Sequence, residues 1–178
     1  MKLKELFLFE SLPQRRDDER AYLRKLSSAL LKIADDCPLC GYVFMGTYLG
    51  YPPDSIKHFL KRSIKINDMM NKGYTDDEII SALPFKGGAF DGTGFLPSPR
   101  DRKKKPENLV RTINKNRFYK NPFVLEPDNN EDDDIMISVV RELKRNKAFN
   151  EKCLENLRKI APSIPEININ IDQYIQRE

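Results

Sequence analysis

The chain has 178 residues, of which 39% are hydrophobic and 33% charged, and its formal net charge is +4. This composition predicts one globular domain with its own core, and no apolar stretch approaches the roughly 20 residues of a membrane span, which excludes an integral membrane protein. Three cysteines do not make a disulfide framework, so cysteine usage favours a reducing compartment.

The first fifty residues predict a leader, a helix and a strand. Residues 1–10 form a short apolar run that ends at a glutamate and precedes a Ser-Leu-Pro break. Residues 15–36 carry apolar side chains at helical spacing, with acids early and bases late, and are predicted to be helical. Residues 37–53 combine turn formers with aromatic and β-branched residues, which predicts a short strand or hairpin.

Two helices and a long loop should follow. Residues 54–71 are predicted to form an amphipathic helix, with lysines on the face opposite the apolar stripe. Thr75-x-x-Glu78 is a capping box that opens a short helix, and Pro84 ends that helix. The glycine- and proline-rich residues 85–105 are predicted to be a loop, and loops of this length are typical of functional or disordered segments.

The second half is expected to hold three more helices and a late strand. The predicted helices are 106–116, 135–146 and 148–160. From Ile167 onward, isoleucines alternate with polar residues, which predicts an edge strand that could pair with a strand near 42–48. Residues 11–178 are therefore expected to form one compact, mainly helical α+β domain with a few short strands.

Charge is concentrated in two neighbouring segments. Ten basic and three acidic residues lie between positions 86 and 120, whereas residues 126–134 hold six acids and no base. A basic segment with Phe118 and Tyr119 alongside could neutralise phosphates and stack on bases. Alternatively, the acidic segment folds against the basic one, or both are solvated. The candidate nucleic-acid-binding residues are Arg100, Arg102, Lys103, Lys104, Lys105, Arg111, Lys115, Arg117 and Tyr119.

A Cys-x-x-Cys motif at Cys37 and Cys40 is the candidate for metal or redox chemistry. Two such thiolates make half of a tetrahedral zinc site, but His58 and Cys153 are the only other histidine and cysteine, and neither makes a recognisable ligand pair. A redox motif usually opens a helix after a strand, whereas the predicted order is helix, motif, strand. Two thiols in a turn beside the core, with no cofactor, are favoured, and zinc at Cys37 and Cys40 is the alternative.

The opening stretch MKLKELFLFES carries a further signal. Leu8-Phe9-Glu10 fits a pattern of Leu or Ile, any residue, then Glu, and Ser11 follows as a small residue. The stretch resembles the capsid-targeting peptides of the internal head proteins of T-even-like bacteriophages, in which the prohead protease cuts after the glutamate. The resemblance covers residues 1–11 and implies packaging with DNA, trimming to Ser11 and delivery to the host. An ordinary first helix that joins the core is the alternative.

These features predict a virion-associated phage protein that contacts prohead components and acts by binding a host protein or nucleic acid, in the virion and the host cytoplasm. The alternative is an intracellular nucleic-acid-binding phage protein for DNA packaging or transcription control. An enzyme is the least supported class. His58 is interpreted as a partly buried, hydrogen-bonded structural residue, and acid pairs such as Asp76 and Asp77 are typical of helix starts. No membrane partner is expected.

Overall fold

The computed structural model describes residues 37–86, 90, 95–118 and 140–167. This part of the chain is helical, and it contains no strand. Residues 140–145 are helical. The other elements are α3 (Pro38–Tyr48), α4 (Pro53–Asn71), α5 (Asp76–Ala82), η2 (Asp101–Lys103), α6 (Pro106–Asn116), α8 (Lys147–Ile160) and η3 (Ala161–Ser163).

Several of the sequence predictions fall outside the described residues. They are the leader (1–10), the helix over 15–36, the acidic segment 126–134 and the later isoleucines of the proposed edge strand. They stay predictions, and so does the choice between a leader that is removed and a first helix that joins the core.

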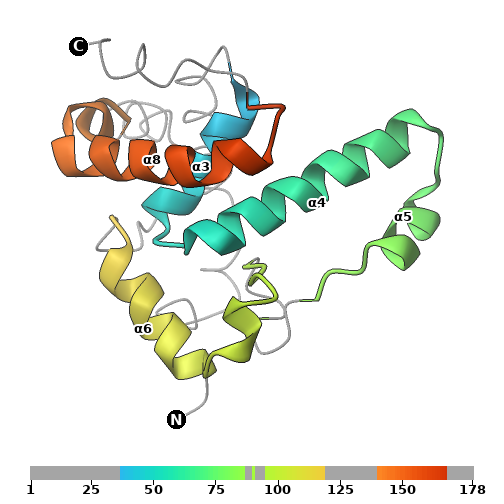
Figure 1. Cartoon of the computed structure of the whole chain (residues 1–178), viewed down its shortest axis with the longest axis horizontal. Helices are drawn as coiled ribbons and strands as arrows, with labels where there is room; N and C mark the ends of the chain where they lie inside the picture. Colours follow the sequence, from blue (N-terminus) through green and yellow to red (C-terminus); the bar gives the residue numbers. More distant parts are fainter. Residues whose placement is uncertain (1–36, 87–89, 91–94, 119–139, 168–178) are drawn as a thin grey trace, which may run out of the picture.

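The main core forms where α3, α4 and α8 meet (Figure 1). Each of these helices packs against the other two. Val43 of α3, Leu60 of α4 and Leu157 of α8 are each fully buried. Burying a large aliphatic side chain stabilises the folded state by about 1.5–3 kcal/mol, so this three-helix contact supplies much of the driving force for folding.

The prediction of a strand over 37–53 is wrong, because this segment forms α3. Pro38 occupies the first helical position, where the missing N–H costs no hydrogen bond. Val43, Phe44 and Tyr48 are all buried, so α3 is covered on several sides and lacks the polar face that marks an amphipathic helix. Packing against α4 and α8 overrides the local preference of aromatic and β-branched residues for strands. The expected α+β class is therefore corrected to helical for the described residues.

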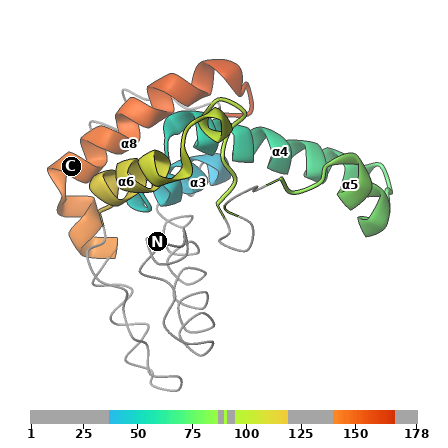
Figure 2. The same cartoon turned by 90° about the horizontal axis from the view of Figure 1, so that it is seen from below.

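The helices predicted over 54–71 and after Thr75 are confirmed as α4 and α5. The Thr75 N–H donates to Glu78 Oε2 at 2.8 Å, and the Glu78 N–H donates to Thr75 Oγ1 at 3.3 Å, which completes the predicted capping box. Arg62 of α4 holds the end of α5, since its Nη2 donates to the Leu83 carbonyl at 2.9 Å. Both views show the far half of α4 and α5 extending away from the other helices (Figures 1 and 2).

The predicted start of α6 at Pro106 is confirmed. One face of this helix builds a second apolar cluster, and Tyr51 contacts both this cluster and the main core. The buried members of the second cluster are Phe90, Phe95, Leu109, Val110 and Ile113. Residues of the long predicted loop are thus part of a core, because two of its phenylalanines pack under α6.

The C-terminal ends of α3 and α6 are joined through the backbone. Gly50 has φ of +79°, the Gly50 N–H donates to the Thr47 carbonyl at 3.0 Å, and the Tyr51 N–H donates to the Gly46 carbonyl at 2.8 Å. This pair of hydrogen bonds is the Schellman motif, which needs a left-handed residue and so favours glycine. The Phe118 N–H, just after α6, donates to a carbonyl at the end of α3 at 3.0 Å.

The predicted helix over 148–160 is confirmed as α8, and Asn146 caps it by accepting a hydrogen bond from the Phe149 N–H at 3.0 Å. The predicted late strand does not begin at Ile167. This residue is buried in the main core, and its N–H donates to the Ile164 carbonyl at 3.0 Å, as in a turn. Its proposed pairing with 42–48 is also wrong, because those residues belong to α3.

Candidate polyanion-binding site

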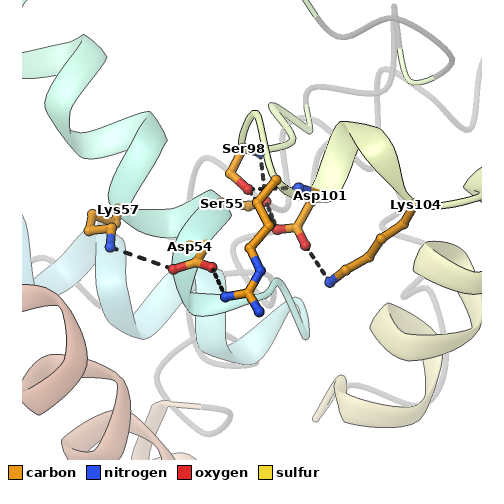
Figure 3. Close-up of polar contacts among 7 residues, drawn as sticks. Asp54, Ser55, Lys57, Ser98, Asp101 and Lys104 are labelled. Carbon is orange, nitrogen blue, oxygen red and sulfur yellow. Dashed lines mark hydrogen bonds and ion pairs between the residues drawn. The ribbon is translucent and has the colours of Figure 1, made fainter.

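A buried aspartate fixes residues 100–105, which we call the basic turn, to the start of α4 (Figure 3). Asp101 is only 1% exposed. Its Oδ2 accepts hydrogen bonds from Ser55 Oγ at 2.7 Å and Ser98 Oγ at 3.0 Å, and its Oδ1 accepts one from Lys104 Nζ at 2.5 Å. A buried carboxylate is tolerated only when its oxygens have partners, so these contacts hold the turn in one position.

The ionised form of Asp101 is the form that fits this site. Burial raises the pKa of Asp101, but the hydrogen bonds from Lys104, Ser55 and Ser98 outweigh burial and leave the pKa below its ordinary value. The carboxylate is therefore charged at neutral pH, and the Lys104 ammonium is its counter-charge.

Ser98 explains why the chain turns at this point. Its hydroxyl accepts a hydrogen bond from the Asp101 N–H at 3.0 Å, and its carbonyl accepts one from the Arg102 N–H at 2.9 Å. A serine hydroxyl that satisfies a free N–H is a common way to open a helical turn, and η2 follows. Asp101 then lies inside, whereas Arg102 and Lys103 are exposed. The basic part of the predicted 85–105 loop is therefore a defined turn.

A pocket of about 510 Å³ opens beside the basic turn. It lies between the start of α4, the basic turn and the end of α8. Four of its side chains are cationic and two are anionic, which gives it a net positive charge, and its volume is in the range of small-ligand sites. The lining residues are Pro52, Pro53, Asp54, Lys57, Arg100, Asp101, Lys104, Lys159 and Ile160.

The ion pairs at the rim of this pocket are weak. Asp54 lies 3.5 Å from Lys57 Nζ (Figure 3). Its other oxygen lies 3.4 Å from Arg100 Nη1. The side chains of Asp54 and Arg100 are 39% and 81% exposed. Lys159 is the exception, because it lies 2.5 Å from Glu155, whose pKa Lys152 and Lys159 lower to about 2. Long, exposed pairs contribute at most about 1 kcal/mol each, so an incoming anion can compete with Asp54 for Lys57 and Arg100.

The positive charges of the same surface also lower the pKa of His58. Burial lowers the pKa of His58, and the positive charges of Arg102 and Arg62 lower it further. Arg102 belongs to the basic turn and Arg62 to α4, so cations from two elements act on one imidazole. The prediction that His58 is partly buried is confirmed.

The structure brings together five of the predicted binding residues and leaves two others apart. Arg111 and Lys115 are exposed on α6, one helical turn from each other, and neither lines the pocket. They belong to α6, which begins directly after the basic turn. The five residues in the basic turn are Arg100, Arg102, Lys103, Lys104 and Lys105.

Of the other residues considered for binding, Arg117 and Phe118 do not line the pocket. Arg117 is half-buried at the end of α6. Phe118 packs its ring against Phe149, with 5.2 Å between the centroids, so it is a core contact and not a platform for bases. The residues that lie outside the described part are Tyr119 and the proposed processing residues Leu8, Glu10 and Ser11.

Sequence reasoning missed several residues of the site, among them Ser55, Ser98, Asp101, Lys57 and Lys159. Ser55 is 46 positions from its partner Asp101, and Lys159 comes from the last turn of α8. The lysines on the polar face of the 54–71 helix were the one sequence feature that included Lys57, and they indicated only that this face is exposed to solvent. Only the tertiary fold brings these side chains to the basic turn.

The Cys-x-x-Cys motif opens a helix, contrary to the predicted order. Cys37 and Cys40 form a disulfide at the start of α3. In this state each sulfur is bonded to the other, and neither is a thiolate that could bind the zinc ion considered above. No group of three or more potential metal ligands occurs among the described residues.

Comparisons with known proteins found no match, so the geometry of the site is the basis for proposing a function. No family model matches the chain, and no curated protein or solved structure matches it. In the described part of the chain, none of the helices combines the length and the apolar character needed to cross a membrane.

Proposed function

We propose that the protein binds nucleic acid through the phosphate backbone and that the basic turn is its main contact surface. The observation that supports this proposal is the anchoring of the turn by Asp101, because one buried carboxylate holds a group of exposed cations in a fixed arrangement. The exposed cations that it presents beside Lys104 are Arg100, Arg102, Lys103 and Lys105.

Three of these cations are exposed, and the acidic segment 126–134 that could fold against them lies outside the described residues. Arg102, Lys103 and Lys105 are exposed and make no ion pair with any residue that the structure describes. Cations on an anchored turn lose less conformational freedom on binding than cations on a flexible tail. Each phosphate that they neutralise releases condensed counterions from the nucleic acid, and such contacts fix position without reading base sequence.

Delivery with phage DNA is a separate proposal that depends on residues 1–11 and not on the basic turn. Nucleic-acid binding is compatible with a protein that is packaged with DNA and equally with an intracellular DNA-packaging or transcription factor. The resemblance of the leader favours the first of these, and the basic turn supports both.

Replacing Arg102, Lys103 and Lys105 together with alanine is expected to weaken binding to a short DNA duplex by about 100-fold near 0.1 M salt. The loss arises because three phosphate contacts and their counterion release disappear. The slope of log K against log salt concentration should fall by about 2 to 3. Fluorescence anisotropy with a labelled duplex at four or five salt concentrations measures both quantities.

The matched control removes the same number of exposed cations elsewhere. Arg141, Lys144 and Lys147 lie just before or at the start of α8, and all three are exposed. Their combined replacement with alanine changes the net charge equally and should change DNA affinity far less. Equal losses in the two variants would show that total charge decides binding, and salt-independent binding by the unmodified protein would also contradict the proposal.

Bound DNA should raise the pKa of His58, because phosphates offset the positive charges of Arg102 and Arg62 that lower it. His58 is the only histidine in the chain, so an NMR titration of its ring protons gives a single curve with and without DNA. Arg102→Ala should raise the His58 pKa in the free protein and reduce the further rise on binding. A His58 pKa that is unchanged in saturating DNA would argue for a contact elsewhere.

A further inference from the structure

The disulfide between Cys37 and Cys40 uses residues that the proposed function does not need. Cys37 is the N-cap of α3 and Cys40 is its third residue, with 5.3 Å between the two Cα atoms. The Cys40 N–H donates to the Cys37 carbonyl at 2.9 Å. The helical turn itself holds the two residues side by side, so they stay adjacent whether or not the sulfurs are bonded.

The N-terminal end of α3 favours a thiolate at Cys37, whereas the charges of Asp35 and Asp36, which directly precede Cys37 in the sequence, oppose it. No side chain caps this helix end by a hydrogen bond, and its first turn contains no acidic residue. The free N–H groups at a helix N-terminus carry partial positive charge, which stabilises a nearby thiolate. When the bridge is reduced, Cys37 stands at the N-cap, where an anion is most favoured.

The fold does not depend strongly on this bridge. The bridge encloses only two residues, and a loop that short restricts the unfolded chain much less than a long one does. The position of α3 is set by its packing against α4 and α8, which involves apolar side chains along the whole helix. The helix should therefore survive reduction.

The third cysteine cannot replace either member of the pair. Cys153 of α8 is free and buried. Burial raises its pKa to about 12, against a smaller opposing effect of its hydrogen bond with Thr47. A neutral, buried thiol of this kind is a poor nucleophile. Thiol chemistry in the described part of the chain is thus confined to Cys37 and Cys40.

We infer that Cys37 and Cys40 are a redox-active pair that cycles between disulfide and dithiol in the folded protein, with a dithiol as the reductant. Cys37 and Cys40 are both buried, at 4% and 0% exposure, so attack begins at Cys37, the less buried of the two, when the start of α3 opens locally. A thiolate of the reductant bonds to Cys37 Sγ, the bond between the two Sγ atoms breaks, and Cys40 leaves as a thiolate that takes up a proton. The second thiol of the reductant then displaces Cys37, which is protonated in turn. Two electrons and two protons pass to the protein, and the reductant becomes a disulfide.

The test counts free thiols in the full-length chain after treatment in native buffer. Protein exposed to dithiothreitol is quenched with acid, denatured and labelled with a maleimide of large mass, and a parallel sample is first returned to oxidised glutathione. We expect three labels after reduction, one label after reoxidation, and an unchanged helical circular dichroism signal in both states. Cys37→Ser is the control, since it should give two labels under either condition.

Three outcomes would overturn the inference. The first is a bridge that dithiothreitol opens only in denaturant, which would make it purely structural. The second is a reduced pair that does not reform the bridge in oxidised glutathione. The third is loss of the helical signal on reduction, because the pair would then support the fold and could not cycle within it.

Discussion

Gly50→Ala is expected to lower the free energy of unfolding by about 3 kcal/mol or more, which is a large effect for one methyl group. Two causes add. Gly50 has φ of +79°, a conformation in which an L-residue is strained. A Cβ at this position would also collide with the Ile113 carbonyl oxygen and lie 2.6 Å from the Arg117 backbone nitrogen. These are backbone atoms at the end of α6, so they cannot rotate away, and the contact between α3 and α6 must open.

Gly73→Ala is the matched control for this prediction. Gly73 follows α4 in the same Schellman arrangement, with φ of +82°, but a Cβ there would meet no atom within 4 Å. Only the backbone strain applies, so the expected loss is about 1 kcal/mol. Urea unfolding followed by circular dichroism measures both variants. Similar losses for the two would show that the close approach of α6 to Gly50 contributes nothing.

The amphipathic helices of this chain could be predicted from sequence because their signals are local. In α4, α6 and α8 the apolar residues repeat at helical spacing and the opposite face is polar, which is the pattern of a helix with one face in a core. The capping box at Thr75 is a four-residue signal that needs no tertiary information. These elements were predicted almost to their ends.

The helix α3 could not be predicted in the same way. A helix that is covered on several sides has no polar stripe, and its aromatic and β-branched residues favour a strand when they are considered alone. Gly46 shows the constraint that decides the matter, since a Cβ there would lie 2.7 Å from the side chain of Ile56 in α4. Close packing of two helices selects such a residue, and packing is not visible in a local pattern.

The candidate site was predicted in part for the same reason. The cations of the basic turn are neighbours in sequence, so their charge could be seen directly. Asp101 was counted among them only as a negative charge that reduces the local total. Its role as the anchor depends on Ser55, which the fold brings from the start of α4. Sequence showed which charges lie close together, and the structure shows what holds them.

Asp101→Asn is expected to lower the free energy of unfolding by about 2–3 kcal/mol. Asparagine fits the space, but its amide NH₂ is a donor that would face the hydroxyl or ammonium donors of Ser55, Ser98 and Lys104. Asp54→Asn is the control. Its side chain is 39% exposed and its ion pairs are long, so the expected loss is below about 0.5 kcal/mol. Urea unfolding at neutral pH compares the two variants.

The stability difference between the unmodified protein and Asp101→Asn should depend on pH. The pKa of Asp101 is lower in the folded state than its value near 4 in the unfolded chain. The ionised carboxylate therefore contributes stability above about pH 4, and this contribution is lost as the pH falls through the folded-state pKa. Unfolding curves at several pH values should converge at the acid end. A constant difference would assign the effect to shape and not to charge.

DNA binding by Asp101→Asn separates anchoring from simple electrostatics, because the two predict opposite signs. Removing one negative charge beside the basic turn should strengthen binding if only the summed charge matters. Loss of the contacts to Ser55 and Ser98 should weaken binding, because the cations must then be ordered when DNA arrives. We expect weaker binding for Asp101→Asn and slightly tighter binding for Asp54→Asn, measured by anisotropy under conditions in which both variants are folded. Tighter binding by both variants would show that summed charge decides binding and that anchoring by Asp101 does not contribute to it.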